Sequence, residues 1–291
     1  MHQIDHTTCA LGCTHRRAWL QGAGLVLLSP AASLAQVAAR EGVEVGGNSV
    51  FTRLVPADTI EQSAGQQYAQ MLQQAADAKA LAGPDHPQLR RLRGIAKKII
   101  PYAQGWNPRA KDWRWEVNLI GSKQINAFCM PGGKIAFYSG ILEQLKLTDD
   151  EVATVMGHEV AHALREHARA RMGKNAATGI GANLLSNVLG LGQLGQTVTS
   201  YGAQLLTLRF SRGDESEADL VGMELAARAG FDPRAGVSLW QKMAAASKGA
   251  PPQWLSTHPS GDTRVADIQA NLPKVMPLFD RTPTRRAALP P

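Results

Sequence analysis

The pattern His158-Glu159-Val160-Ala161-His162 constrains this chain more than any other stretch of its sequence. On an α-helix, side chains four residues apart lie one turn above each other, so His158 and His162 present two imidazoles to one point. Two imidazoles at this spacing are typical of a zinc site. Glu159 projects about 100° round the helix from His158, beside the metal position, where it can take a proton from water. The spacing therefore predicts a hydrolytic zinc site with Glu159 as its general base.

The residues around this pattern predict a helical stretch from Thr148 to Met172. Thr148 and Glu151 have the spacing of a capping box, and the acidic residues after Thr148 suit the positive end of the helix dipole. An apolar stripe lies roughly opposite the two histidines, so one face is expected to pack and the other to carry chemistry; the stripe consists of Val152, Met156, Val160 and Ala163. The alternative is a solvated helix with two incidental histidines.

The composition sets limits on the class of protein. With 291 residues, 44% of them hydrophobic, the chain suffices for one sizeable domain or two small ones. A formal charge of +7 predicts attraction to anionic surfaces such as phospholipid headgroups. Because no recognition motif accompanies this charge, we expect no nucleic-acid partner.

The first 35 residues have the organisation of an export signal. Paired arginines precede an apolar run from Ala18 to Leu28, and small residues follow, so we expect cleavage after Ala35. The arginine pair resembles the twin-arginine type but also suits the general export pathway, and an uncleaved membrane anchor is the alternative. Cys129 is the only cysteine beyond this segment, so the mature chain is expected to lack an intramolecular disulfide.

Periodicity divides the rest of the chain. We expect an extended arm over 36–58, a mostly helical α+β domain over 59–272 and a Pro-rich tail over 273–291. The first helix of the domain is expected to begin with Thr59 as its cap. The glycine-rich stretch 173–202 predicts a mobile hairpin over the cleft, or a lid that touches substrate or makes peripheral contact with a membrane.

Apolar residues change to a period of two after Trp113, which predicts a strand near 113–119. Two further runs, 125–130 and 134–138, flank a Pro-Gly-Gly turn and predict a hairpin. We therefore expect a small antiparallel or mixed sheet beside the metal-binding helix.

A catalytic zinc site usually takes three protein ligands and keeps a fourth position for water. An astacin-like third histidine would stand at position 168, which is alanine. His167 is about 140° round the helix from His162, on the apolar stripe, and is expected to be structural. The third ligand is therefore expected among the carboxylates further along the chain.

Glu215 is the best candidate for this third ligand. Asp219, one helical turn further on, can accept a hydrogen bond from the free nitrogen of a ligand imidazole and orient it. Glu217 points roughly the other way and is expected only to cap the start of its helix with Asp214. The alternative is that Glu215 and Asp219 are merely solvated acids.

A set of motifs resembles the zinc metallopeptidase family of the CAAX prenyl endopeptidases and HtpX-type proteases, most of all its soluble periplasmic branch without tetratricopeptide repeats. The motifs are His-Glu-Val-Ala-His, Ser-Arg-Gly-Asp-Glu-Ser-Glu-Ala-Asp, Thr-His-Pro with an arginine six residues after its histidine, and Asn-Ala-Phe before Pro-Gly-Gly. The resemblance implies a zincin-like (gluzincin) fold with one Zn²⁺ per chain. It assigns His158, His162 and Glu215 as ligands, Glu159 as base, and Asp219 as the partner behind a ligand imidazole.

The resemblance also implies that His258 and Arg264 lie near the reacting carbonyl. Two roles for His258 are open. It could hydrogen-bond the oxyanion beside Arg264. Alternatively it could bind zinc as a fourth ligand and close the site, because it lies on a Pro-flanked loop and a neutral imidazole binds zinc well.

The implied activity is zinc-dependent endoproteolysis of unfolded, misfolded or membrane-associated polypeptides in the bacterial periplasm. An exposed strand containing Lys134, Ile135 and Ala136, with Asn126 and Ala127 beside it, is expected to hold the substrate by main-chain pairing. The alternative is a zinc-stabilised, chaperone-like binding module with little or latent proteolysis. Glu159 distinguishes the two, since a purely structural zinc site would not need it.

Overall fold

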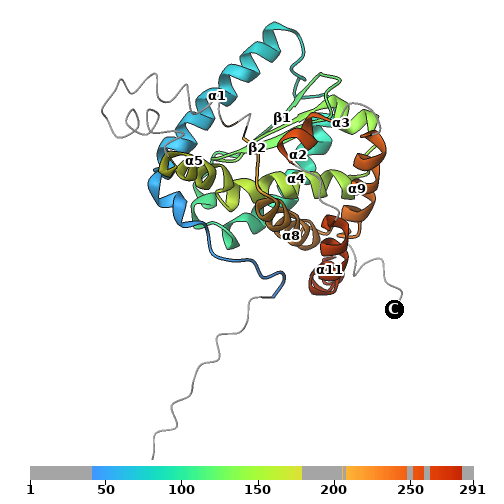
Figure 1. Ribbon diagram of the computed structural model, residues 1–291. Helices are drawn as coiled ribbons and strands as arrows, with labels where there is room; N and C mark the ends of the chain where they lie inside the picture. The colour runs from blue at the N-terminus through green and yellow to red at the C-terminus, as the bar shows by residue number, and fades with distance from the viewer. Residues whose placement is uncertain (1–40, 179–204, 206–207, 248–251, 259–262, 284–291) are drawn as a thin grey trace, which may run out of the picture. The chain divides into compact units, whose positions relative to one another are not determined.

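The computed structural model describes residues 41–178, 205, 208–247, 252–258 and 263–283, which belong to a compact unit that begins at Glu41 (Figure 1). The expected signal segment 1–35, and the part of the glycine-rich stretch from 179 to 202, lie outside the described residues. Within these ranges the fold is α+β and mostly helical with one small sheet, as predicted. No helix in them is both long and apolar enough to cross a bilayer.

The elements follow one another in this order. They are η1 (Val50–Leu54), α1 (Ala57–Asp77), α2 (Pro87–Ile99), η2 (Ile100–Gly105), η3 (Pro108–Lys111), β1 (Glu116–Ile120), β2 (Ala127–Met130), β3 (Lys134–Tyr138), α3 (Ser139–Gln144), α4 (Asp149–Leu164), α5 (His167–Ala177), α8 (Arg212–Arg228), α9 (Ala235–Ala246), α10 (Gln253–Thr257) and α11 (Arg264–Asp280).

The sheet is mixed, with β3 in the middle. β2 and β3 form the predicted antiparallel hairpin, whereas β1 runs parallel to β3 with Glu116 opposite Lys134. The expectation that 134–138 is an exposed strand is therefore wrong, because both edges of β3 are already paired and Lys134, Ile135 and Ala136 are buried. A period of two predicts a strand but does not reveal which strand lies in the middle.

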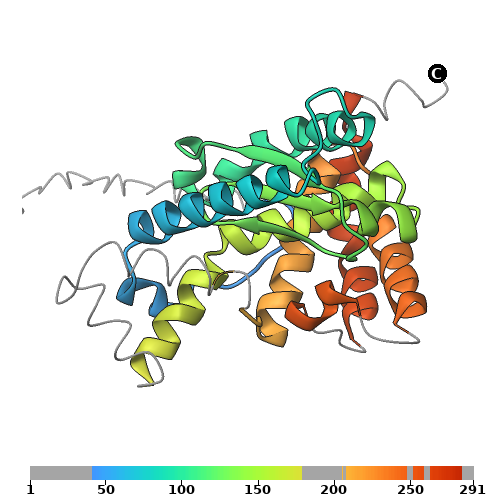
Figure 2. The same ribbon diagram turned by 90° about the horizontal axis from the view of Figure 1, so that it is seen from above.

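Helices cover both faces of this sheet (Figures 1 and 2). On one face, Tyr68 of α1 packs in a cluster with Ile120, Met130 and Ala136. On the other face, side chains such as Phe137 join the main hydrophobic core, to which α2 and α4 contribute. The alternation of side chains across each strand thus places α4 directly against the sheet.

Helix α4 lies at the centre of the core. The predicted capping box is present, with Thr148 Oγ1 accepting from the Glu151 amide and the Glu151 carboxylate accepting from the Thr148 amide. Every residue from Glu151 to Leu164 except Thr154 is buried, so the alternative of a solvated helix is wrong. The expected division into a packing face and an open face is also wrong, since the face with the histidines is buried too.

The helical stretch is interrupted before Met172. Helix α4 ends at Leu164, and Glu166 adopts a left-handed conformation with φ of 55° before α5 begins at His167. This one left-handed residue changes the direction of the chain. Its carboxylate contacts Arg169 (2.7 Å) and Asn48 (3.3 Å), and these contacts stabilise the left-handed conformation of Glu166. Neither glycine nor proline marks this break in the sequence.

Two expected boundaries differ from the structure. Helix α1 begins at Ala57, with Pro56 in the cap position, so Thr59 is not its cap and the expected arm already contains η1. The tail expected from residue 273 is instead the second half of α11, which continues to Asp280 through two prolines. Burial of its apolar residues, including Val275, Leu278 and Phe279, offsets the backbone hydrogen bonds that proline removes.

Helices α4 and α8 cross at two glycines. A Cβ atom on Gly157 would lie 2.6 Å from the Gly222 carbonyl oxygen, and one on Gly222 would lie 2.6 Å from the His158 amide nitrogen. No side chain fits at this crossing, so the two backbones touch. The second helix begins with its own capping box between Ser211 and Asp214.

Candidate metal centre

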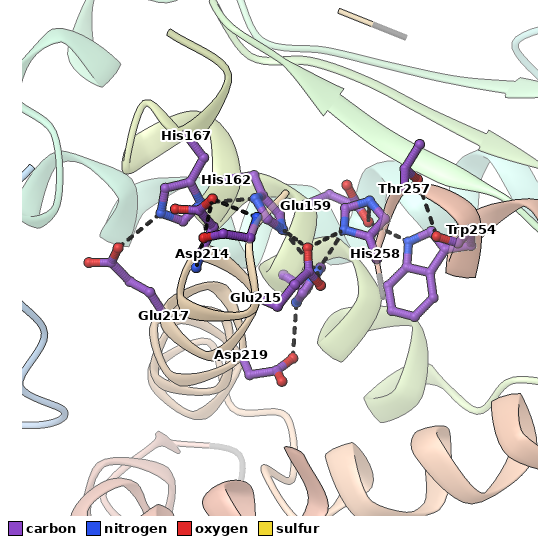
Figure 3. Close-up of polar contacts among 12 residues, drawn as sticks. Glu159, His162, His167, Asp214, Glu215, Glu217, Asp219, Trp254, Thr257 and His258 are labelled. Atoms are coloured by element: carbon purple, nitrogen blue, oxygen red, sulfur yellow. Dashed lines mark hydrogen bonds and ion pairs between the residues drawn. The ribbon is translucent and has the colours of Figure 1, made fainter. Parts of the chain in front are cut away.

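Four buried side chains bring one nitrogen or oxygen atom each to a common point. His158 and His162 come from α4, Glu215 from α8, and His258 directly follows α10; these atoms all lie within 4.8 Å of one another. Figure 3 shows the Glu215 carboxylate between His162 and His258. The two Nε2 atoms of the α4 histidines are 3.1 Å apart, and Glu215 oxygens lie 3.4 Å and 3.5 Å from them.

These residues fit a zinc-type ion. Three imidazole nitrogens and one carboxylate oxygen are donors that zinc accepts in tetrahedral sites. The Nδ1 atom of His158 lies 3.0 Å from Asp219, and that of His162 lies 2.9 Å from His167. Both Nε2 atoms therefore face the same point, which is suited to a shared cation.

Asp219 lies where the sequence placed it, behind a ligand imidazole. Its carboxylate contacts His158 Nδ1 and accepts two hydrogen bonds from Arg264, of 2.6 Å and 2.7 Å. Burial alone would raise the pKa of Asp219, but the Arg264 charge and the His158 bond hold that pKa below its ordinary value. The carboxylate is therefore ionised at neutral pH.

The electrostatics of the histidines and of Glu215 follow from burial and from these contacts. Burial would lower the pKa of His158, but its bonds to Asp219 and Glu215 outweigh burial and raise that pKa to about 9. Burial dominates for His162, whose pKa falls well below its ordinary value. Burial would raise the pKa of Glu215, but three histidines lower it strongly, so Glu215 is anionic. Glu215 thus supplies an anionic donor, and a metal ion would have to displace the proton of His158.

Arg264 lies beside the candidate metal centre and contacts both of its buried acids. Besides its two bonds to Asp219, its Nη1 atom donates to Glu215 Oε2 at 2.7 Å, and its guanidinium carbon lies 3.9 Å from the centre of the Trp240 ring. The side chain is only 3% exposed. Its single positive charge therefore offsets one of the two negative charges of the buried carboxylates.

Glu159 lies beside the four donors and is 2% exposed. Its Oε1 atom accepts a hydrogen bond of 2.6 Å from the Trp254 indole and lies 3.5 Å from His258 Nε2. Figure 3 shows Trp254 and His258 side by side, and their rings stack with centroids 5.0 Å apart. Trp254 is a residue of the site that sequence reasoning missed, because neither its neighbours nor its spacing connects it to the metal-binding pattern.

A cavity of about 60 Å³ opens beside Glu159. One side is formed by residues 126–131, which include β2, and the other by Glu159, His162 and Ala163 of α4. Asn126 and Ala127 therefore line the cleft, whereas Lys134, Ile135 and Ala136 do not appear in its lining. The order of the strands explains this difference, because β2 is the edge of the sheet next to α4.

His167 and Glu217 have contacts that the sequence did not predict. His167 Nδ1 lies 2.9 Å from His162 Nδ1, and His167 Nε2 lies 2.9 Å from Glu217 Oε2. The helix break at Glu166 moves His167 away from the position that a continuous helix would give it. Glu217 is not a cap partner of Asp214, which pairs with Ser211 instead.

Comparison with known proteins agrees with this geometry. The model of peptidase family M48 matches residues 88–272, so the chain belongs to this family. Mitochondrial metalloendopeptidase OMA1 of Arabidopsis thaliana is 41% identical over 150 residues, 52% of this chain and 30% of the relative. OMA1 of Schizosaccharomyces pombe is 35% identical over 192 residues, 65% of this chain and 54% of the relative. The beta-barrel assembly-enhancing protease of Yersinia pestis is 32% identical over 169 residues, 55% of this chain and 35% of the relative. The chain thus spans about half or less of each relative.

Replacing Glu215 by alanine is expected to lower metal content markedly, because it removes the anionic donor of the centre. Asp214→Ala is the matched control on the same helix, since it removes the capping-box partner at a cost of about 1 kcal/mol but touches no donor. Metal per chain, measured by elemental analysis of folded protein, checks this difference. An Asp214 variant that loses as much metal as the Glu215 variant would contradict it.

Proposed function

We propose that the protein is a zinc-dependent endopeptidase that cleaves unfolded or misfolded polypeptides in the bacterial cell envelope. The observation that carries the proposal is the convergence of His158, His162 and Glu215 beside Glu159, in a cleft bordered by the edge of a sheet. The family supports peptide hydrolysis, and the donor set favours zinc. The resemblance to HtpX-type proteases supports substrates that have lost their fold.

In the proposed reaction, His158, His162 and Glu215 hold the metal. When bound there, zinc would polarise the substrate carbonyl and acidify the attacking water. Glu159 accepts a proton from this water and later donates it to the leaving amine. The indole of Trp254 holds one Glu159 oxygen at 2.6 Å, which leaves the other oxygen for the water. Because Glu159 is only 2% exposed, little bulk solvent can compete for this transfer.

The outer edge of β2 is the proposed substrate-pairing strand. The Asn126 carbonyl accepts a hydrogen bond from the main-chain amide of Tyr138 in β3. The main-chain groups of the neighbouring residues Ile125 and Ala127 therefore point away from β3, toward the outer edge of the sheet. This edge borders the cleft. An extended peptide pairing there would run past Glu159, and only an unfolded or flexible segment can adopt that conformation.

Changing Glu159 to glutamine tests the proposed function. The variant keeps a similar shape but cannot accept the water proton, so zinc is expected to stay bound while casein cleavage falls by about 10² or more. Casein hydrolysis with and without a chelator, together with zinc content, measures both effects. Cleavage at the native rate would overturn the assignment of the base.

A chaperone-like zinc module is the alternative function, and the same experiment separates it. Such a module would bind zinc and unfolded protein, but neither its wild type nor its His258→Ala variant would show cleavage that a chelator abolishes. The burial of Glu159 beside the donors favours the peptidase, because a structural zinc site has no use for a second carboxylate there.

We further propose that the enzyme is latent, with His258 as a fourth zinc ligand. His258 Nδ1 lies 3.1 Å from Glu215 and 3.3 Å from His158 Nε2, at the position that a catalytic water would need. In the competing role, His258 would instead hydrogen-bond the oxyanion. The inward position of His258 therefore supports the latch.

His258→Ala is expected to raise basal casein cleavage if His258 is a latch, because a water molecule can then take its place. If His258 stabilises the oxyanion, the same variant should lose about 10² in rate. Ser256→Ala, which changes an exposed side chain of the same segment, is the control. Basal cleavage that falls in the His258 variant alone would count against latency.

We propose that the protein acts in the periplasm after cleavage at Ala35, on soluble or membrane-associated substrates, with peripheral membrane contact through 173–202. Support comes from the signal-like start of the chain and its net charge of +7. Sequencing the N-terminus of protein from the cell envelope should find Gln36 as the first residue. An intact Met1 would favour the membrane anchor.

A further inference from the structure

We propose that His167 and Glu217 are positioning residues that fix the tautomer and the orientation of His162. This inference rests on the proposed zinc site, but it concerns residues that have no assigned role. His167 is 4% exposed and contacts His162 on one side and Glu217 on the other (Figure 3). The three side chains form one continuous row of hydrogen bonds that ends at the metal position.

The direction of these hydrogen bonds follows from the acid at the far end. An ionised carboxylate only accepts, so His167 must donate from Nε2 to Glu217. A neutral His167 then has a lone pair on Nδ1, which accepts from the Nδ1–H of His162 across 2.9 Å. His162 consequently carries its proton on Nδ1 and presents the Nε2 lone pair to the metal.

The two α4 ligands are thus supported in different ways. His158 contacts the Asp219 carboxylate directly at 3.0 Å. In the part of the chain that the structure describes, the contact of His162 Nδ1 is an imidazole and not a carboxylate, and this imidazole of His167 spans the distance to Glu217. A carboxylate behind a metal-binding imidazole commonly contributes 10- to 100-fold to metal affinity, so we expect about this effect for the extended row.

Further contacts hold the row in place. Arg165 donates to Glu217 Oε1 from Nε at 2.7 Å and also bonds the Gly46 carbonyl. The His162 ring stacks on Phe210 with centroids 4.0 Å apart. The left-handed Glu166 between Arg165 and His167 sets the start of α5, so the position of His167 depends on the backbone as well as on side chains.

The test compares zinc affinity among variants of residue 167 in the full-length protein. His167→Leu removes the acceptor for His162, and zinc binding is expected to weaken about 10- to 100-fold. His167→Asn restores an acceptor, because its amide oxygen can take the place of Nδ1, and is expected to bind zinc nearly as well as wild type. Competition with a chromogenic chelator measures affinity, and the absorption spectrum of the cobalt-substituted protein reports ligand geometry.

Met172→Ala is the matched control for a merely structural effect. Met172 lies in the same helix as His167 and is buried against Val55 and Ile60, but it does not contact His162. Its truncation is expected to lower the melting temperature and leave zinc affinity unchanged. If Met172→Ala weakens zinc binding as much as His167→Leu does, the positioning role is wrong.

Glu217 gives a second, independent test, which holds even if His167→Leu fails to fold. Glu217→Ala should weaken zinc binding in the wild-type background but not in the His167→Asn background. In the latter, the asparagine side chain no longer links Glu217 to His162 by hydrogen bonds. Equal losses in both backgrounds would overturn the proposal. A wild-type protein that binds no zinc would overturn the proposed function as well, whereas normal zinc binding by His167→Leu would overturn this inference alone.

Discussion

The close contact between α4 and α8 determines where the donors of the metal centre lie. Gly157 and Gly222 allow the two backbones to touch, whereas larger residues would hold helix axes about 8–10 Å apart. Each glycine in a helix interior costs about 1 kcal/mol relative to alanine, so the two glycines at the crossing lower the intrinsic stability of their helices. Glu215 and Asp219 precede Gly222 by seven and three residues and share its face of α8. The crossing therefore places Glu215 and Asp219 next to the two histidines of α4.

This geometry buries charge, and the surrounding residues compensate for it. Glu215 is fully buried, and the side chain of Asp219 is 8% exposed. Arg264 donates to both carboxylates and stacks on Trp240, so one cation neutralises one of the two negative charges. When His158 is deprotonated, as a metal ligand must be, one negative charge of the two acids remains, and this favours a cation at the shared point. The position of Arg264 thus explains why two acids can remain ionised inside the core.

The sequence was most informative where a local pattern determines a local structure. Both capping boxes could be read from residue spacing alone, although the second was assigned to the wrong partner of Asp214. The hairpin followed from the change of period and its turn residues. Spacing on one helix placed the two histidines on a shared face, and spacing on another placed Glu215 one turn from Asp219.

Features that depend on tertiary contacts could not be read in this way. The order of the strands is set by which faces the helices cover, so the central position of β3 had no local signal. The left-handed Glu166 is stabilised by partners distant in the sequence, and Asn48 is one of them. The prediction of one continuous helix through Glu166 therefore placed the His167 side chain in the wrong direction, and its contact with His162 was not predicted. The role of Arg264 was similarly hidden, because its two acidic partners lie on another helix.

The segment that carries His258 would connect the proposed latency with the proposed binding of substrate. The main-chain amide of Trp254 donates to the Ile125 carbonyl at 3.1 Å, on the same edge of the sheet that is proposed to pair with substrate. The indole of Trp254 meanwhile occupies one oxygen of Glu159. A peptide that extended its pairing along this edge to Ile125 would compete for that carbonyl and would displace Trp254. Because His258 stacks on the same indole, such displacement would loosen the fourth ligand and release the base together. Pairing of the substrate with the sheet edge and opening of the metal centre would then be a single step, in which an unfolded chain supplies the hydrogen bonds that the latch gives up.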